Sequence, residues 1–275
     1  MHIKIFAGAA LATALITTAA SAQMGASPKS WNGFYVGGQL GYSSDIKGSS
    51  KETVTFDRNL DGTYGDAFPN FAPGSCPGSA VNGTAAAGCF SDSRNGQWKV
   101  MAGYDMQFGE DRGLVVGGVI DAGKQYYVNY VSTFSTTPAS YVFGARLKEN
   151  GTARVRAGYS FPTGTLAYGT GGVAYGKINN FFLSTNTVNT RTESGTKEGR
   201  WGYVYGGGLE QKVGNFSVGF LYTYTSLKND DYVVRLSGGP ATSPFTAQNA
   251  SGTDLRRSKD SFGFHSAVAT VAWHF

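Results

Sequence analysis

The stretch that decides the fold closes the chain: it reads HSAVATVAWHF and covers residues 265–275. Successive side chains of a β-strand point to opposite faces. One face of this strand is therefore small or apolar and consists of Ala267, Ala269, Val271, Trp273 and Phe275. The other face carries the polar side chains of Ser266, Thr270 and His274. Such a strand offers one face to hydrocarbon, but a soluble sheet uses the same alternation, so the rest of the chain must decide.

The first residues have the charged, apolar and small-residue order of a secretory signal peptide. Lys4 supplies the charge, residues 5–17 form the apolar stretch, and Ala20-Ser21-Ala22 forms the cleavage site. The apolar stretch is shorter than the roughly 20 residues of a membrane-spanning helix, which argues against an uncleaved anchor. We predict a signal peptide over residues 1–22 and a short periplasmic segment over residues 23–32.

The composition favours strands and turns over helices. The chain contains 40 Gly, 16 Tyr and 18 Phe, and only 15% of its residues are charged. After residue 22 no apolar stretch is long enough to cross a bilayer as a helix, so any membrane span must be a β-strand. The net charge is +5, with basic and acidic residues interspersed, which predicts no nucleic-acid partner.

Segments with a two-residue hydrophobic period occur along the whole mature chain. We expect eight strands, at residues 33–43, 97–108, 114–124, 152–161, 165–178, 201–213, 216–227 and 265–275. The fifth is so rich in glycine that its facing is ambiguous. Aromatic residues lie near the strand ends, which is typical of the two interfaces of a bilayer.

The connections between these strands alternate in length. Residues 109–112, 162–164 and 214–215 are short turns. The long polar connections cover residues 44–96, 125–151, 179–200 and 228–260. This alternation predicts an all-β fold, an eight-stranded antiparallel up-and-down transmembrane β-barrel over residues 33–275 in the cell outer membrane. The four long loops are then extracellular and both termini are periplasmic.

The minority face of several strands carries charged side chains. They are Lys99, Asp105, Asp121, Arg154, Arg156 and Glu210. These are too many charges for the dry core of a small soluble barrel, which favours a membrane barrel with a polar lumen. Two interpretations of this lumen charge network remain open. It forms either a paired plug that fills the lumen or the lining of a gated narrow channel.

The two cysteines, Cys76 and Cys89, lie in a glycine-rich loop of an exported chain. A disulfide is the economical interpretation, because a metal or redox site would need further Cys or His nearby.

Motifs that would indicate catalysis or cofactor binding are incomplete. Residues 57–62 (DRNLDG) resemble the first half of a calcium loop, but Phe68 stands at the final acidic position, which favours an Asx-turn. Residues 169–174 (GTGGVA) spell a dinucleotide fingerprint within a strand. Only His265 and His274 remain in the mature chain, and no serine follows His265 on its own face. We expect no enzyme activity, metal or cofactor.

Five motifs carry a family resemblance. They are residues 31–38 (WNGFYVGG), 154–159 (RVRAGY), 171–176 (GGVAYG), 206–210 (GGGLE) and the terminal residues 265–275. From about Trp31 to Phe275 the chain resembles small OmpA-like outer-membrane β-barrels, most closely the porin-like surface immunogens of alphaproteobacteria. One departure is Leu221, where the family often has a charged residue.

The resemblance implies a monomeric barrel that contacts outer-membrane lipid and lipopolysaccharide. It also implies that Val271, Trp273 and Phe275 form the signal that the outer-membrane assembly machinery reads. The expected function is that of a non-catalytic integral outer-membrane protein that contributes to envelope structure and surface display, as a surface antigen. The alternatives are a narrow porin for small solutes and a haem-binding surface receptor.

Overall fold

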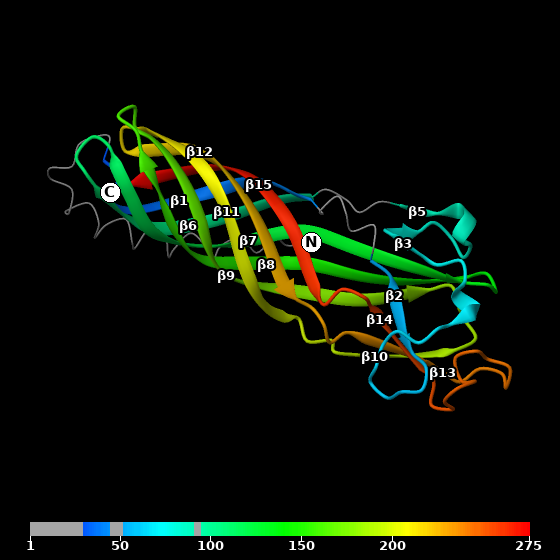
Figure 1. The fold of residues 1–275 in the computed structure, drawn as a ribbon. Helices are drawn as coiled ribbons and strands as arrows, with labels where there is room; N and C mark the ends of the chain where they lie inside the picture. The colour runs from blue at the N-terminus through cyan, green and yellow to red at the C-terminus, as the bar shows by residue number, and fades with distance from the viewer. Residues whose placement is uncertain (1–29, 45–51, 91–94) are drawn as a thin grey trace, which may run out of the picture.

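The structure, a computed structural model, describes residues 30–44, 52–90 and 95–275 (Figure 1). The predicted signal peptide and most of the predicted periplasmic segment lie outside the described residues. In the described part of the chain, eight long strands form the barrel. They are β1 (Gly33–Ser44), β6 (Asn95–Phe108), β7 (Gly113–Ser135), β8 (Ala139–Ser160), β9 (Thr165–Ser184), β11 (Gly199–Val213), β12 (Phe216–Lys228) and β15 (Ser261–His274).

Each barrel strand pairs antiparallel with the next one along the chain, and β1 pairs with β15 to close the sheet. The closing register places Gly38 opposite Val271 and Tyr42 opposite Ala267. A closed sheet has no free edge, which satisfies every backbone group inside a membrane. The predicted eight-stranded antiparallel barrel is confirmed.

The two faces of the strands differ as the sequence pattern predicts. Val100 and Val155 point outward and are 60% and 69% exposed, whereas Lys99 and Arg156 point inward and are 9% and 3% exposed. The glycine-rich β9 follows the same rule: Tyr168 faces the lumen and Val173 faces outward. Among the described residues, no helix is long and apolar enough to cross a membrane.

The prediction of a loop over residues 125–151 is wrong, because most of these residues belong to strands β7 and β8. β7 and β8 continue as a hairpin that turns at residues 136–138. The pairing of β7 with β8 shifts between Lys124 and Tyr127, and that of β8 with β9 between Leu147 and Glu149. In β8, Lys148 and Glu149 are consecutive exposed residues at this bulge, so the inward face moves from even to odd positions. A search for uninterrupted alternation therefore stops at the bulge, although the strand goes on.

The extensions of β7, β8 and β9 support a folded region at the end of the barrel with the long connections, which we call the cap. Its second sheet has the order β10 (Thr190–Ser194), β13 (Val233–Ser237), β14 (Thr253–Arg257), β2 (Val54–Asp57). Figure 1 shows β2, β10, β13 and β14 gathered at this end. The smaller elements are β3 (Ser75–Pro77), β4 (Ser79–Ala80), β5 (Cys89–Phe90) and the 3-10 turns η2 (Pro69–Phe71) and η3 (Ala85–Ala87).

The cap has a hydrophobic core of its own. Its buried members are Val54, Phe56, Phe68, Phe71, Val131, Ala139, Tyr141, Phe143, Phe182, Tyr232, Val234, Leu236, Phe245 and Leu255. Aromatic rings dominate it, and Phe56 lies 4.6 Å from Phe71 between ring centroids. Aromatic side chains bury large areas, so this core holds the second sheet against the strand extensions. The described parts of the long connections are thus packed structure rather than open loops.

Candidate functional site

The lumen of the barrel contains the six charged residues predicted from the sequence, and they form two clusters. In the first cluster, Asp121 on β7 accepts hydrogen bonds from Lys99 Nζ on β6 at 3.0 Å and from Arg154 Nη2 on β8 at 2.7 Å. The Thr152 hydroxyl donates to the same carboxylate at 2.7 Å. These side chains meet because the register places Asp121 opposite Thr152.

The second cluster is centred on Arg156 of β8. Its Nε donates to Asp105 on β6 at 2.8 Å, and its Nη1 donates to Glu210 on β11 at 3.0 Å. The guanidinium also lies over the rings of Tyr35 and Tyr168, 4.6 and 5.1 Å from the ring centroids. Sequence reasoning missed both tyrosines, because Tyr35 lies among glycines on β1 and β9 had no clear facing.

Charge is balanced across the two clusters, with Lys99, Arg154 and Arg156 against Asp105, Asp121 and Glu210. All six side chains are at most 9% exposed. Buried ions persist where they are paired and hydrogen-bonded, as here. Leu221, where the resemblance suggested a charge, is buried in an apolar group instead, and the network needs no further ion there.

Trp31 closes the lumen at the end with the short turns. Its ring is fully buried, packs edge-on against His274 at 5.3 Å between centroids, and has Lys212 Nζ 5.6 Å from its centroid. The Trp31 backbone N–H donates to Gln107 Oε1 at 3.0 Å, and Lys212 Nζ donates to the carbonyl of Ser30. We call this group the Trp31 plug.

On the other side of the ion clusters an apolar layer fills the barrel below the cap. It consists of Tyr127, Ala145, Leu147, Ala174, Ile178, Val204, Leu227, Phe262 and Phe264. A small cavity beside Lys99, Asp121 and Arg154 has room for about one water molecule. Side chains therefore occupy the lumen from the Trp31 plug to the cap.

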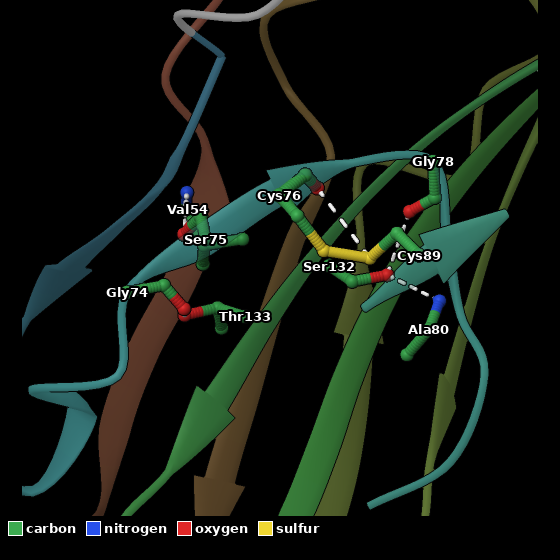
Figure 2. The surroundings of a disulfide bond; sticks show 9 residues. All are labelled: Val54, Gly74, Ser75, Cys76, Gly78, Ala80, Cys89, Ser132 and Thr133. Carbon is green, nitrogen blue, oxygen red and sulfur yellow. Dashed lines mark hydrogen bonds between the residues drawn. A yellow bond between two sulfur atoms is a disulfide. The ribbon is translucent and has the colours of Figure 1, made fainter. Parts of the chain in front are cut away.

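The predicted disulfide between Cys76 and Cys89 is present and joins β3 to β5 (Figure 2). This segment is fastened to the extension of β7 by Ser132. The Ser132 hydroxyl donates to the Gly78 carbonyl and accepts from the Ala80 N–H, both at 2.8 Å. The disulfide thus holds one side of the cap together.

The segment that resembles a calcium loop is a turn organised by Asp57. Its carboxylate accepts from the backbone N–H groups of Leu60 at 2.7 Å and Gly62 at 2.8 Å. The Thr63 N–H and the Asn59 amide hold the pKa of Asp61 below its usual range. The carboxylates are committed to protein donors, as in an Asx-turn. The described residues contain no group of three or more His, Cys, Asp or Glu that could hold a metal ion.

The two histidines of the mature chain lie on opposite faces of β15. His265 faces outward and shares a 2.7 Å hydrogen bond with the Tyr222 hydroxyl. His274 faces inward, and its Nε2 lies 3.0 Å from Ser217 Oγ, a pair that sequence reasoning missed. Within the described residues His274 Nδ1 has no hydrogen-bond partner, so the orienting group of a catalytic triad is missing.

The residues of the predicted assembly signal end the last strand on the lipid-facing side. Val271 and Trp273 are exposed, and the Trp273 ring packs edge-on against Phe216 at 4.4 Å. The Phe275 N–H donates to the Phe34 carbonyl at 2.9 Å, which ties the terminus to β1. Recognition of this end by the assembly machinery stays a prediction.

A closed antiparallel sheet with an apolar outer wall and a polar, ion-paired lumen defines an outer-membrane β-barrel. The chain is similar to the 31 kDa outer-membrane immunogenic protein of Brucella melitensis biotype 1, with 32% identity over 133 residues, 46% of this chain and 52% of that protein. The protein of the same name from Brucella suis biovar 1 matches with the same figures. The chain thus spans about half the length of the curated relatives it matches. No family model matches it.

Two solved outer-membrane proteins are similar in structure. OprG from Pseudomonas aeruginosa has 12% sequence identity and a TM-score of 0.45, over 89% of this chain and 97% of its own. Ail, the attachment invasion locus protein of Yersinia pestis, has 11% identity and a TM-score of 0.30, over 88% and 99%. These similarities say nothing about the activity of this chain.

Proposed function

We propose that the protein is a closed, non-catalytic outer-membrane barrel that displays the cap at the cell surface and contributes to envelope structure. The end with the short turns and both termini face the periplasm. The observation that carries this proposal is the filled lumen, in which the Trp31 plug, two ion clusters and an apolar layer follow one another.

The energetics of this lumen favour a closed barrel. An eight-stranded barrel has an interior that side chains can fill. Ions moving through it would have to separate buried pairs, and breaking such a pair costs about 3–5 kcal/mol. The apolar layer between the ion clusters and the cap consists mainly of aliphatic and aromatic side chains, which offer few hydrogen bonds to a passing ion or water.

The orientation follows from the unequal ends of the barrel. Outer-membrane barrels have short periplasmic turns and longer extracellular connections. Here the short turns join β6 to β7, β8 to β9 and β11 to β12, and the cap occupies the opposite end. A packed cap with a disulfide suits an oxidising exterior.

Trypsin added to intact cells tests this orientation. It should cleave the protein only in the cap, and cleavage at the short turns would contradict the orientation.

Single-channel recording in planar bilayers tests closure. We expect the inserted wild-type protein to give no discrete conductance steps, while gel mobility of unheated and boiled samples shows that the barrel is folded. Steps from folded wild-type protein would support the narrow-pore alternative, in which the charged side chains around the cavity beside Lys99 and Arg154 would line the path. Replacing Lys99 by Gln should then change the ion selectivity of the steps.

The haem-receptor alternative stays a prediction, and a haem titration without a Soret shift would remove it.

A further inference from the structure

Four basic side chains lie close together on the outside of the barrel, just below the cap. Lys124 on β7, Arg146 and Lys148 on β8, and Lys177 on β9 are all exposed. We call them the basic belt. The strand register places Lys124 and Lys177 on either side of Glu149.

The belt has more positive charge than its acidic neighbours neutralise. Lys148 pairs with Glu198 at 3.0 Å, and Lys177 pairs with Glu149 at 3.1 Å. All four of these side chains are 41–50% exposed, so both pairs are open to solvent and to exchange with another anion. Among the described residues, Lys124 and Arg146 form no ion pair.

The belt borders the lipid-facing wall directly. Two residues before Lys177 on β9, toward the membrane, Tyr175 pairs with Trp201 of β11. Their ring centroids are 5.0 Å apart. At the other edge of the belt, Trp98 on β6 pairs with Lys124 on β7, and its side chain is 48% exposed. Tryptophan and tyrosine mark the depth at which hydrocarbon gives way to headgroups. The basic belt therefore lies at the level of the lipid headgroups.

The opposite wall has a different chemistry near the same level. Strands β11, β12 and β15 present a cluster of neutral and aromatic side chains there, formed by Tyr203, Tyr205, Tyr222, Tyr224 and His265. Beyond it, at the end of β12, Lys228 is paired with Asp230 at 2.9 Å. Among the described residues of these two walls, the surplus positive charge thus lies on the side formed by β7, β8 and β9.

We propose that the basic belt binds the phosphate groups of lipopolysaccharide in the outer leaflet, a proposal that rests on the orientation given under the proposed function. Charge complementarity selects an anionic headgroup, and ammonium and guanidinium groups form charge-assisted hydrogen bonds with phosphate oxygens. Continuity with the lipid-facing wall selects a lipid over a free anion, because acyl chains on the wall below bring the headgroup to the belt.

The test compares two variants that remove the same charge from the full mature protein. Lys124→Gln with Arg146→Gln removes the two belt cations that form no ion pair, together with the contact of Arg146 over the Phe181 ring, and leaves both ion pairs intact. The matched control, Arg191→Gln with Lys228→Gln, removes two exposed cations outside it. Binding of fluorescent bisphosphoryl lipid A to the folded barrel in zwitterionic micelles should weaken about tenfold or more in the belt variant, because each surface cation contributes about 1 kcal/mol. The control should bind like the wild type.

Two further probes identify the ligand. Dephosphorylated lipid A should bind the belt variant and the wild type equally, and inorganic phosphate at equal concentration should not displace lipid A. Unchanged lipid A binding in the belt variant, equal loss in the control, or displacement by inorganic phosphate would overturn the proposal. The heat-dependent shift in gel mobility and the absence of conductance steps test the closed barrel separately from lipid A binding. A failed binding experiment is therefore distinguishable from failure of the proposed function.

Discussion

Arg156 is the residue on which the lumen network depends most, and Arg156→Met is the sharpest perturbation of it. This side chain is the cation shared by Asp105 and Glu210, which are 0% and 4% exposed. Methionine fills a similar length without a charge, so the substitution leaves both carboxylates buried without the cation that hydrogen-bonds them. The rings of Tyr35 and Tyr168 lose their guanidinium partner as well.

The expected loss is large because two buried anions are affected. Removing one partner of a buried pair destabilises by about 3–5 kcal/mol. We expect Arg156→Met to lower the free energy of unfolding by about 5 kcal/mol, at the upper end of that range. Replacing the whole cluster, with Asp105→Leu and Glu210→Met added, should recover most of the loss, because buried ion pairs exchange for apolar side chains at little net cost.

Urea unfolding of the barrel in lipid vesicles, followed by tryptophan fluorescence and by gel mobility, measures these differences. Arg191→Met, at an exposed position on β10, is the control and should change stability by about 0.5 kcal/mol or less. A loss below about 1 kcal/mol for Arg156→Met, or a triple variant no more stable than the single one, would refute the paired-network reasoning.

Three other variants test the remaining parts of the account. Trp31→Ala should lower the free energy of unfolding by about 3–5 kcal/mol and admit water at the short-turn end, seen as current noise in planar bilayers; unchanged stability would contradict the plug. Replacing Cys76 and Cys89 by Ser should loosen the cap by about 3 kcal/mol, so that trypsin cuts it faster while the heat shift of the barrel persists. Deleting Phe275 should reduce insertion into the outer membrane in cells without preventing refolding in detergent, and equal insertion would argue against an assembly signal.

The barrel itself could be predicted from the sequence because its physics is local. Period-2 alternation along β6 and β15 indicates which side chains face lipid, and short turns alternate with long connections. The lumen charges follow from the same alternation, since Lys99, Asp105 and Arg156 stand on the face opposite the apolar side chains. The alternation of faces in each strand is visible within about ten consecutive residues.

The cap could not be predicted in this way because its contacts are non-local. Its second sheet joins β2 to β14, so that Phe56 pairs with Leu255 across most of the chain. The strand extensions begin after shifts in register, and at the shift in β8 the inward face changes from even positions such as Arg154 to odd positions such as Leu147. Pairing within the lumen was equally hidden, because the sequence shows that Arg156 faces inward but not which carboxylates reach it.

The central claim is that β15 and its neighbours turn their apolar face to lipid, and the most direct measurement probes that face residue by residue. Residues 267–272 are replaced one at a time by cysteine, in a chain whose Cys76 and Cys89 are serine, and labelled with a fluorophore in vesicles that contain lipid-borne quenchers. The account predicts strong quenching at Ala267, Ala269 and Val271 and weak quenching at Val268, Thr270 and Ala272. Uniform quenching, or quenching at the even positions, would contradict it.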